Sequence, residues 1–353
     1  MARKRTTMAD VAEQAGVSIT AVSLVLNNRV GTRLSESVAE RVRSAATELG
    51  YRPNLTARAL STQRSQIIGF ISELVTTGRF GNDLIRGALD EAKRQGHVLF
   101  IAETAGEPGA AAVAVNALAD RQVDGIIFAA TRPERLRMPS HPPEIPIIML
   151  NAMSDDDAPV VLADERDGAR RIVDLLLDAG NTEDVAIIGR SRTGQEDPEL
   201  TIAVERRLSG IRESLDAHGV EPIAEVHLEP WSLETGYHAV KGLLDSGIKP
   251  RALICLNDRI AFGAYRALNE AQLRVPDDVS VVSFDDDDIA VYLEPKLTTV
   301  AFPYEDMGAL AVRLLLGDEP KLPEYLVKMP IRIRGSVKQW GDSRSTKHSG
   351  HGA

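Results

Sequence analysis

The sequence predicts an all-α N-terminal segment with a helix–turn–helix pattern, followed by an α/β core of two subdomains with parallel sheets. Three observations predict this class. Residues 6–50 show helical spacing of apolar residues, short apolar strands alternate with amphipathic helices from residue 66 on, and this alternation occurs twice. Strand–helix alternation is typical of parallel sheets with right-handed crossovers. Its repetition predicts a cleft between two similar halves.

The N-terminal segment is predicted to contain three short helices. Thr7 and Asp10 can form a capping-box-like pair at the start of the first helix, and Gly16 can end it. Ser18 can cap the second helix, and Ser35 can cap the third. The residues expected on the buried faces are Ala9, Val11, Ala12, Ala15, Ala21, Val22, Val25, Leu26, Val38, Val42, Ala45, Ala46 and Leu49.

Strands and helices alternate through the core. The expected strands are 67–71, 98–102, 125–129, 146–150, 185–188, 223–228, 252–256 and 279–284. The helices expected between them include 82–95, 166–179, 206–218 and 259–272. The first strand is not followed by a G-x-G-x-x-G pattern, which disfavours a dinucleotide site. No cofactor is expected.

Charge is divided unevenly along the chain. The whole sequence has a net charge of −10, from 41 basic and 51 acidic residues, and this total alone disfavours a nucleic-acid partner. Residues 1–64, however, hold ten Lys/Arg and only five Asp/Glu, so this segment carries +5 and the remainder −15. The basic segment is therefore suited to nucleic-acid phosphates, while the acidic body is not.

The remaining features of the sequence disfavour several classes of protein. The composition, 43% hydrophobic and 26% charged, is that of a globular chain rather than a disordered or collagen-like one. No run of about 18 apolar residues is present for a membrane span. No apolar segment follows the basic N-terminus, as it would in a secretory signal. The single Cys255 lies in an apolar run and is expected to be a buried hydrophobe in a cytoplasmic protein.

One motif in the N-terminal segment predicts DNA binding. Ala12, Gly16 and Val22 stand at the spacing A-x3-G-x5-V. Ala12 lets the two helices approach, Gly16 adopts the turn conformation that side chains resist, and Val22 packs the second helix onto the first. Together with the basic surplus, the N-terminal Arg/Lys arm and the third helix, this motif predicts a DNA-binding helix–turn–helix. The alternative is a small helical hairpin.

This segment resembles the headpiece of the lactose/galactose-repressor (LacI/GalR) family. The resemblance rests on TMADVAEQAGVS at residues 7–18, AVS at 21–23, ELGYRPN at 48–54 and ARAL at 57–60, and it continues to residue 334. It implies a transcriptional regulator with no enzymatic activity and a core of two periplasmic-binding-protein-like subdomains. The implied divisions are a DNA-binding headpiece over 1–52, a hinge helix and linker over 53–65, an effector-binding and dimerisation core over 66–334, and a flexible polar tail over 335–353.

The resemblance assigns DNA contacts to the headpiece and the hinge. It assigns the reading of base edges to Ile19, Thr20 and Leu24. Since Ile19 and Leu24 are apolar, they are expected to contact thymine methyl groups rather than to make bidentate bonds to guanine or adenine; the alternative for Leu24 is a core position. The stretch Asn27–Ser35 is longer than is usual in the family, which leaves the place of Arg33 open. The DNA-binding candidates are Thr7, Ser18, Ile19, Thr20, Ser23, Leu24, Asn27, Arg33, Tyr51, Asn54, Ala57, Arg58 and Leu60.

The segment Leu55–Leu60 resembles the hinge helix of the family. Six residues are too few for a helix that persists alone in water, so the segment is expected to fold only against DNA and a second copy. By resemblance, Leu60 is an apolar wedge in the minor groove, where insertion kinks the duplex, and Ala57 permits close approach. The alternative for Leu60 is an ordinary linker residue.

Four polar or aromatic residues of the core suggest a ligand site before any resemblance is considered. Arg207 lies near the start of a helix, Trp231 lies at a strand–helix junction, and Asn257 and Asp285 directly follow strands. The carboxyl ends of parallel strands are where open α/β sheets bind ligands. Arg and Asp can bond vicinal hydroxyls and Trp can stack on a sugar ring, so a sugar-like ligand is expected.

Structural alternatives exist for the same residues. Arg207 can pair with Glu205 or cap a helix, and Asn257 can be a helix cap. The run of aspartates at 285–288 invites a metal hypothesis, but a solvated, helix-capping acidic turn is favoured because no histidine or second carboxylate cluster accompanies it. The resemblance extends the effector-binding set to Phe80, Asn151, Thr201, Ala203, Arg207, Trp231, Asn257 and Asp285.

Three functions are considered for the whole chain. The leading one is a repressor that binds a pseudo-palindromic operator as a homodimer and is switched by a sugar-like effector bound between the subdomains. The second is a sugar-binding transport-type protein, and the third is an enzyme acting on a sugar. The headpiece disfavours the second, and the absence of a nucleophile elbow, P-loop or metal set disfavours the third. The tail has no leucine heptad, which favours a dimer over a tetramer.

Overall fold

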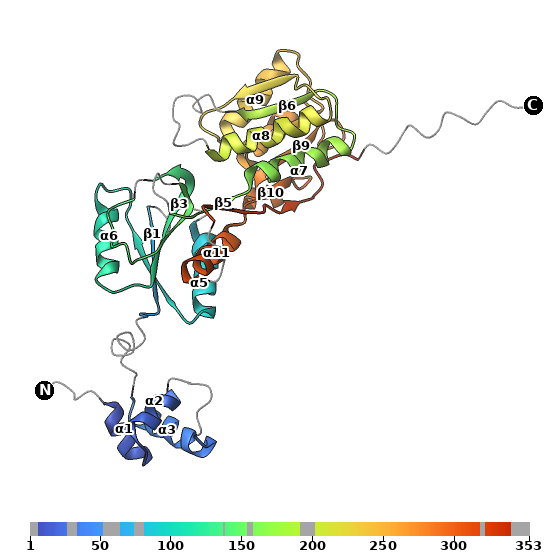
Figure 1. Cartoon of the computed structure of the whole chain (residues 1–353). Helices are drawn as coiled ribbons and strands as arrows, with labels where there is room; N and C mark the ends of the chain where they lie inside the picture. The colour runs from blue at the N-terminus through green and yellow to red at the C-terminus, as the bar shows by residue number, and fades with distance from the viewer. Residues whose placement is uncertain are drawn as a thin grey trace, which may run out of the picture. The chain divides into compact units, whose positions relative to one another are not determined.

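The computed structural model describes residues 6–26, 34–51, 64–73, 81–136, 138–153, 158–190, 202–317 and 322–339. The chain divides into two compact units, Met1–Gln66 and Ile67–Ala353 (Figure 1). The first unit is all-α, and the second contains two six-stranded sheets with helices on their faces. The predicted fold class is therefore confirmed.

The first unit consists of three helices, α1 (Met8–Ala15), α2 (Ile19–Leu26) and α3 (Glu36–Glu48). Thr7 and Asp10 form the predicted capping box, and Gly16 ends α1 with φ 65° in the left-handed region. The core of the unit contains Val11, Val22 and Val42, which are all fully buried. The three helices predicted for this segment are therefore confirmed.

Details of the three helices differ from the prediction. Ala9 is exposed, because it lies on the face of α1 opposite Val11, Ala12 and Ala15. Ser35 stands at the N-cap of α3, but its side chain makes no capping bond and lies 3.0 Å from the Ser37 hydroxyl instead. Within the described residues no single helix is long and apolar enough to cross a membrane. Only α1 and α2 together pass that test, and they are bent by 103°.

The first sheet of the core has the strand order β11-β5-β4-β3-β1-β2, and all its paired strands are parallel. Alternate side chains of β1 and β3 point to opposite faces, so that Phe70 and Ile127 pack with α5 and α11, whereas Ile71 and Ile126 pack with α6. Figure 1 shows α6 on one side of the sheet and α5 and α11 on the other. The elements are β1 (Ile67–Ser72), α5 (Gly81–Arg94), β2 (Val98–Glu103), α6 (Ala110–Ala119), β3 (Gly125–Arg135), β4 (Ile147–Met153), β5 (Val160–Ala163), α11 (Tyr304–Leu316) and β11 (Glu324–Val327).

The second sheet has the order β12-β10-β9-β8-β6-β7, in which only the short edge strand β12 is antiparallel to its neighbour. Its helices pack in two pairs, α7 with α8 and α9 with α10. The elements are α7 (Glu165–Asp178), β6 (Val185–Arg190), α8 (Ile202–Ala217), β7 (Ala224–His227), α9 (Leu233–Asp245), β8 (Ala252–Cys255), α10 (Asp258–Glu270), β9 (Ser280–Asp285), η2 (Asp288–Val291), β10 (Thr298–Ala301) and β12 (Ile331–Arg332).

The chain passes between the two core subdomains three times. It leaves the first sheet after β5, returns after β10 to form α11 and β11, and leaves again to form β12. These passes bring Glu165, Phe302 and the residues around them to the boundary between the subdomains. The carboxyl ends of β4, β5 and β9 lie at the same boundary, where open α/β sheets bind ligands.

The eight predicted strands and four predicted helices are all confirmed, although β3 extends to Arg135 and α8 begins at Ile202. The prediction missed β5, β10, β11 and β12, and it gave no bounds for α6, α9 and α11. Each missed strand has four residues or fewer, although β7 and β8, which also have four, were predicted. The helix α6 is almost entirely apolar, so it lacks the polar face that marks an amphipathic helix.

The predicted flexible tail begins too early. The Ser336 side chain is fully buried, where its hydroxyl accepts a hydrogen bond from the Thr298 amide (2.8 Å) and donates one to the Val281 carbonyl (2.6 Å). The Lys338 amide donates to the Ser280 hydroxyl at 3.0 Å. Residues 335–339 are therefore part of the core, and residues 340–353 lie outside the described part of the chain.

Glycines allow α5 and α11 to pack with their backbones in contact. A Cβ atom at Gly308 would overlap the carbonyl oxygen of Leu84, and one at Gly87 would overlap that of Glu305. The same close approach occurs between α8 and α7, where a Cβ atom at Gly210 would overlap the Arg166 carbonyl. These positions exclude any larger side chain without a shift of the backbone.

Candidate functional site

The candidate DNA-binding surface is the outer face of α2. Ile19 is 53% exposed and Thr20 is also exposed, whereas Ala21, Val22 and Val25 form the buried face of the same helix. Leu24 is half-buried. An exposed isoleucine at the start of a second helix is available to touch the methyl group of thymine.

Two further DNA-binding candidates are exposed residues whose hydroxyl groups form caps. The Thr7 hydroxyl accepts from the Asp10 amide at 3.3 Å, and the Ser18 hydroxyl accepts from the Ala21 amide at 3.2 Å. A phosphate contact by either residue would have to share the hydroxyl with the cap. Ser23 and Tyr51 are half-buried. The candidates that lie outside the described residues are Asn27, Arg33, Asn54, Ala57, Arg58 and Leu60, together with most of the loop at 27–35.

The second candidate site lies between the core subdomains and contains a buried ion pair. Arg207 is 4% exposed and Glu165 2% exposed, and the Nε and Nη2 atoms of Arg207 donate to the two carboxylate oxygens of Glu165 at 2.8 Å each. The guanidinium also donates to the Leu256 carbonyl and lies 4.5 Å from the centre of the Phe284 ring. The ion pair thus fixes the orientation of Arg207 on α8.

The alternative partner expected for Arg207 is wrong. Glu205 lies two residues before Arg207 on α8 and is exposed. Residues two apart on a helix do not face each other, so Glu205 does not reach the buried side on which Arg207 lies. Glu165 begins α7 directly after β5 and is supplied by a strand that the prediction missed.

Asp285 lies at the end of β9, with a carboxylate oxygen 3.8 Å from Arg207 Nη1. Burial raises the pKa of Asp285 to about 8, since desolvation and the nearby Asp258 and Glu165 outweigh the lowering by Arg207. Asp285 therefore provides a carboxyl group that can act as a donor or an acceptor toward a ligand at neutral pH.

Asn257 is a helix cap, as its structural alternative predicts. Its side-chain oxygen accepts from the Ile260 amide at 2.8 Å and starts α10. Trp231 is half-buried against the main core cluster just before α9, and it lines neither of the two inter-subdomain cavities described below. The structure therefore brings Arg207 and Asp285 together and gives Asn257 a capping contact. Of these four residues only Asp285 lines one of the two cavities.

The aspartates at 285–288 form a more buried turn than predicted. Asp287 is 3% exposed and caps η2 by accepting from the Ile289 amide at 3.0 Å. Asp286 pairs with Arg332 at 3.2 Å and Arg334 at 2.6 Å. The helix-capping role is confirmed for Asp287, which is buried, whereas Asp288 is exposed and Asp285 and Asp286 are half-buried. Among the described residues, no group of three His, Cys, Asp or Glu could hold a metal ion.

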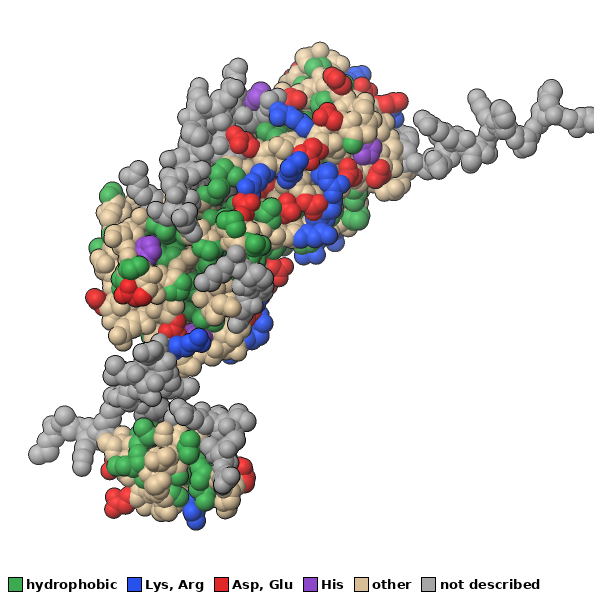
Figure 2. All heavy atoms as spheres, viewed as in Figure 1, with side chains coloured by type: hydrophobic (Ala, Val, Ile, Leu, Met, Phe, Trp, Pro, Cys, Tyr) green, Lys and Arg blue, Asp and Glu red, His purple; other side chains and the backbone are tan. Residues whose placement is uncertain are grey.

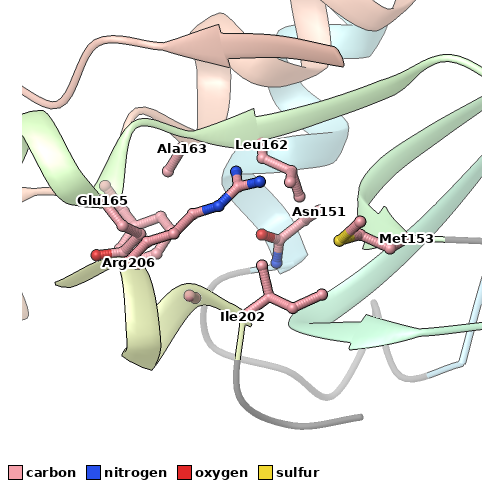
Figure 3. A pocket seen from close by; sticks show the side chains of 9 residues that line it. Asn151, Met153, Leu162, Ala163, Glu165, Ile202 and Arg206 are labelled. Carbon is pink, nitrogen blue, oxygen red and sulfur yellow. The ribbon is translucent and has the colours of Figure 1, made fainter. Parts of the chain in front are cut away.

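Two cavities lie between the subdomains. The larger measures about 540 Å³ and is lined by acidic side chains from both subdomains, including Asp83, Asp285 and Glu305. The smaller measures about 10 Å³ and is shown in Figure 3. Its lining consists of Asn151, Met153, Leu162, Ala163, Glu165, Ile202, Ala203, Arg206 and Phe302. Two predicted effector-binding residues, Asn151 and Ala203, thus line one cavity, whereas Phe80 and Thr201 lie outside the described residues.

Sequence reasoning missed several residues of this site. Glu165, Arg206 and Asp258 are absent from the predicted set, although Asp258 directly follows Asn257. The signal for Glu165 is the run Val160–Ala163, which places Asp164 and Glu165 at the carboxyl end of a strand. Cys255, in contrast, is fully buried as predicted, and burial raises the pKa of its thiol.

Replacing Asp258 by Asn is expected to flatten the pH dependence of stability. Asp258 is fully buried and accepts from the Asp287 amide and the Thr299 hydroxyl, each at 2.7 Å. Burial raises the pKa of Asp258 from 3.8 to about 7, so the folded protein binds this proton more tightly than the unfolded chain does. The free energy of unfolding therefore falls between about pH 4 and pH 7, by about 1.4 kcal/mol per pH unit from this group.

The Asp258→Asn variant conserves both hydrogen bonds. The asparagine oxygen can accept from the Asp287 amide, and its amide can donate to the Thr299 hydroxyl, which accepts as readily as it donates. Urea unfolding at several pH values should find the variant more stable than wild type at pH 8, by a margin that shrinks toward pH 4. Parallel curves for the two proteins would contradict the raised pKa.

Several exposed charges on the core form ion pairs. Arg170 contacts both Asp167 (3.1 Å) and Asp174 (2.8 Å), and Arg166 pairs with Glu213. Figure 2 shows Lys/Arg and Asp/Glu side chains interspersed over the part of this face that carries α7 and α8. Such a mixed surface lacks the single-sign field of a DNA-binding face.

Comparison with known proteins identifies two matching families. Residues 7–54 match the family model of bacterial regulatory proteins, lacI family, and residues 173–337 match that of a periplasmic binding protein-like domain. The HTH-type transcriptional regulator RegA of Clostridium saccharobutylicum is 31% identical over 314 residues, which are 88% of this chain and 92% of the relative. The ribose operon repressor of Escherichia coli K12 is 30% identical over 340 residues, which are 94% of this chain and 99% of the relative.

Solved structures of regulators are similar to this chain over all or part of its length. The lac repressor dimer bound to operator and the anti-inducer ONPF has a TM-score of 0.69 and 27% identity, covering 95% of this chain and 100% of that one. A LacI family transcriptional regulator from Enterococcus faecium with bound ribose has a TM-score of 0.57 and 26% identity, covering 77% of this chain and 99% of that one.

Proposed function

Because the chain belongs to the lacI family of bacterial regulatory proteins, we propose that it is a repressor whose affinity for an operator is switched by a sugar-like ligand. One observation supports this most strongly. A helix–turn–helix unit with exposed Ile19 and Thr20 is joined to a core in which two sheets share a polar, arginine-containing boundary. Such a chain is a regulator rather than an enzyme. A cytoplasmic location belongs to the same proposal, because operator DNA lies there.

Each part of the chain has a separate role in this proposal. Residues 1–52 bind DNA, 53–65 form the hinge and linker, and the core from 66 on binds the effector and dimerises. In this proposal α2 enters the major groove, where Ile19 and Leu24 contact thymine methyl groups and Thr20 contacts a base edge. The remaining DNA-binding candidates contact phosphates or, in the case of Leu60, the minor groove.

A homodimer is supported by an exposed apolar strand at the edge of the first sheet. Val98 is 57% exposed, Ile101 42% and Phe100 39%, and all three lie on β2, which has a neighbour on one side only. An uncovered apolar edge strand is a site for association with another chain. A dimer presents two α2 helices, one for each half-site of a pseudo-palindromic operator.

The ligand is proposed to bind at the boundary between the subdomains. Relatives with ribose in their names or bound to them make a sugar the expected class. Asp285, beside Arg207, lines the larger cavity with a carboxyl group that can bond a ligand hydroxyl, and Asn151 and Ala203 line the smaller cavity. The proposed site also includes Phe80, Thr201, Trp231 and Asn257. A ligand that binds one relative arrangement of the subdomains better than another shifts the equilibrium between them and so changes operator affinity.

Operator binding by a Leu60→Ala variant tests this function. A mobility-shift assay on the upstream region of the gene should show specific binding by wild type, weakened steeply by salt because phosphate contacts release counterions. The variant should lose specific affinity at least about tenfold, because the apolar wedge that kinks the duplex is removed, and non-specific affinity much less. Equal losses would remove the wedge role, and absence of any specific complex would overturn the repressor proposal.

A further inference from the structure

Two residues that line the smaller cavity each have a buried polar atom without a hydrogen-bond partner. These atoms are Oδ1 of Asn151, at the end region of β4 in the first subdomain, and Nη1 of Arg206, on α8 of the second. Figure 3 shows the Asn151 amide and the Arg206 guanidinium lying in the same space. An unpaired buried donor and an unpaired buried acceptor are each costly, so their presence at one cavity points to a ligand group that satisfies both.

The orientation of Asn151 is set by its backbone partner. Its Nδ2 atom donates to the Ala130 carbonyl at 3.1 Å. Because a carbonyl oxygen can only accept, the amide nitrogen must face Ala130 and the amide oxygen must face the cavity. The residue is 1% exposed and has φ 52°, in the left-handed region, so its position is held by its surroundings.

The orientation of Arg206 is set by a bond across the subdomain boundary. Its Nη2 atom donates to Glu324 Oε1 on β11 at 2.7 Å. A guanidinium presents its donors in a fixed fork, so this bond leaves Nη1 directed to the other side. Arg206 thereby connects α8 of the second subdomain with the sheet of the first.

The rest of the cavity offers few competing polar groups. Met153, Leu162 and Phe302 are apolar, and Glu165 already holds Arg207 with both of its oxygens. The volume of about 10 Å³ corresponds to one water-sized group rather than to a whole sugar ring. The cavity is therefore the size of a single ligand substituent, with one donor and one acceptor to meet it.

We propose that Asn151 and Arg206 form a subsite that recognises one hydroxyl group of a neutral sugar, an inference that rests on the sugar effector proposed above. A hydroxyl accepts a hydrogen bond from Arg206 Nη1 and donates one to Asn151 Oδ1 at the same time. A carboxylate or phosphate oxygen only accepts, so it would satisfy Arg206 but repel the Asn151 oxygen. The subsite thus selects neutral sugars over acidic ones, and Arg206 is a specificity-determining residue.

The subsite also connects the two subdomains through the ligand. Its acceptor belongs to the first subdomain and its donor to the second, so one ligand hydroxyl contacts both. A ligand without this hydroxyl leaves both buried atoms unpaired. Sites built to bond a hydroxyl discriminate strongly against the analogue that lacks it.

Calorimetric binding to the full-length chain tests the subsite, with D-ribose, D-galactose and D-glucose as neutral probes. The acidic counterparts are ribose 5-phosphate, galacturonate and gluconate. We expect a neutral probe to bind and its acidic counterpart to bind at least about tenfold more weakly. The substitutions Arg206→Met and Asn151→Leu should each lower the affinity for the neutral probe at least about tenfold. Arg166→Met is the matched control, because it removes an exposed ion pair of α7 and α8 outside the cavity. The Arg166→Met variant should bind the neutral probe with the affinity of wild type.

Each other outcome overturns a defined part of the proposal. Tighter binding of an acidic probe would overturn recognition of a neutral hydroxyl and leave the repressor function intact. Unchanged affinity in both variants would overturn the subsite alone, whereas failure of every probe would overturn the sugar effector together with it. If a variant does not fold, the wild-type protein is tested with monodeoxy analogues of the bound sugar. Removal of the hydroxyl at one position should weaken binding at least about tenfold. If no position has this effect, the subsite is overturned.

Discussion

Replacing Arg207 by Met is expected to destabilise the core by about 3–5 kcal/mol, since it leaves a buried carboxylate without its cation. Glu165 is 2% exposed and receives two hydrogen bonds from Arg207. The methionine also leaves the Leu256 carbonyl without this donor. Urea unfolding followed by tryptophan fluorescence measures the loss in the core alone, because both tryptophans, Trp231 and Trp340, lie beyond residue 66.

Two further variants separate the buried ion pair from a general effect of losing an arginine. Arg170→Met removes an exposed arginine that contacts Asp167 and Asp174, and it should change stability by less than about 1 kcal/mol. The double variant Arg207→Met with Glu165→Leu should regain much of the lost stability, because no charge is then left buried alone at this point. A double variant as unstable as Arg207→Met alone would contradict the unpaired carboxylate as the cause.

Gly308→Ala is expected to destabilise the core by about 3 kcal/mol, although alanine is the better helix former. A Cβ atom there would overlap the Leu84 carbonyl oxygen and approach the Ala88 amide nitrogen at 2.9 Å. Both atoms belong to the backbone of α5, so no side chain can rotate away, and α11 must move away from α5. Urea unfolding by the same fluorescence measures the loss.

Gly242→Ala provides a matched control for this substitution. Gly242 lies within α9, a helix of 13 residues like α11, and a Cβ atom there meets nothing within 4 Å. The same change should therefore stabilise the protein by about 0.5–1 kcal/mol, which is the helix propensity difference alone. Equal effects of the two substitutions would contradict the backbone contact between α5 and α11.

The helices and strands that have a clear local sequence pattern were predictable. The headpiece follows from caps and helical spacing around Gly16, and most strands follow from apolar runs long enough to distinguish. The strand β10 begins with two threonines that interrupt its apolar run, whereas β5 was missed although its four residues are all apolar. Residues 335–339 look like tail in sequence, and only their partners Val281 and Thr298, distant in the chain, make them core.

The candidate site was predictable in part, for the same reason. Arg207 and Asp285 were found because they stand near elements that the pattern revealed. Glu165 was missed together with β5, and Arg207 was given the sequence neighbour Glu205 in its place. Arg206 and Asn151 acquire their significance from Glu324 and Ala130, which lie 118 and 21 residues away along the chain. No sequence pattern within α8 or β4 predicts these partners.

The three passes of the chain between the subdomains have a consequence for synthesis on the ribosome. The first sheet is begun at Ile67, but α11 and β11, which cover α5 and β5, are not translated until residues 304–327. At roughly 5–20 residues per second, the interval between β5 and β11 lasts roughly 10–30 s. During that time the second subdomain can complete most of its sheet while β5 still lacks its outer neighbour. The half of the core that is translated first is therefore completed only after most of the second half has been translated.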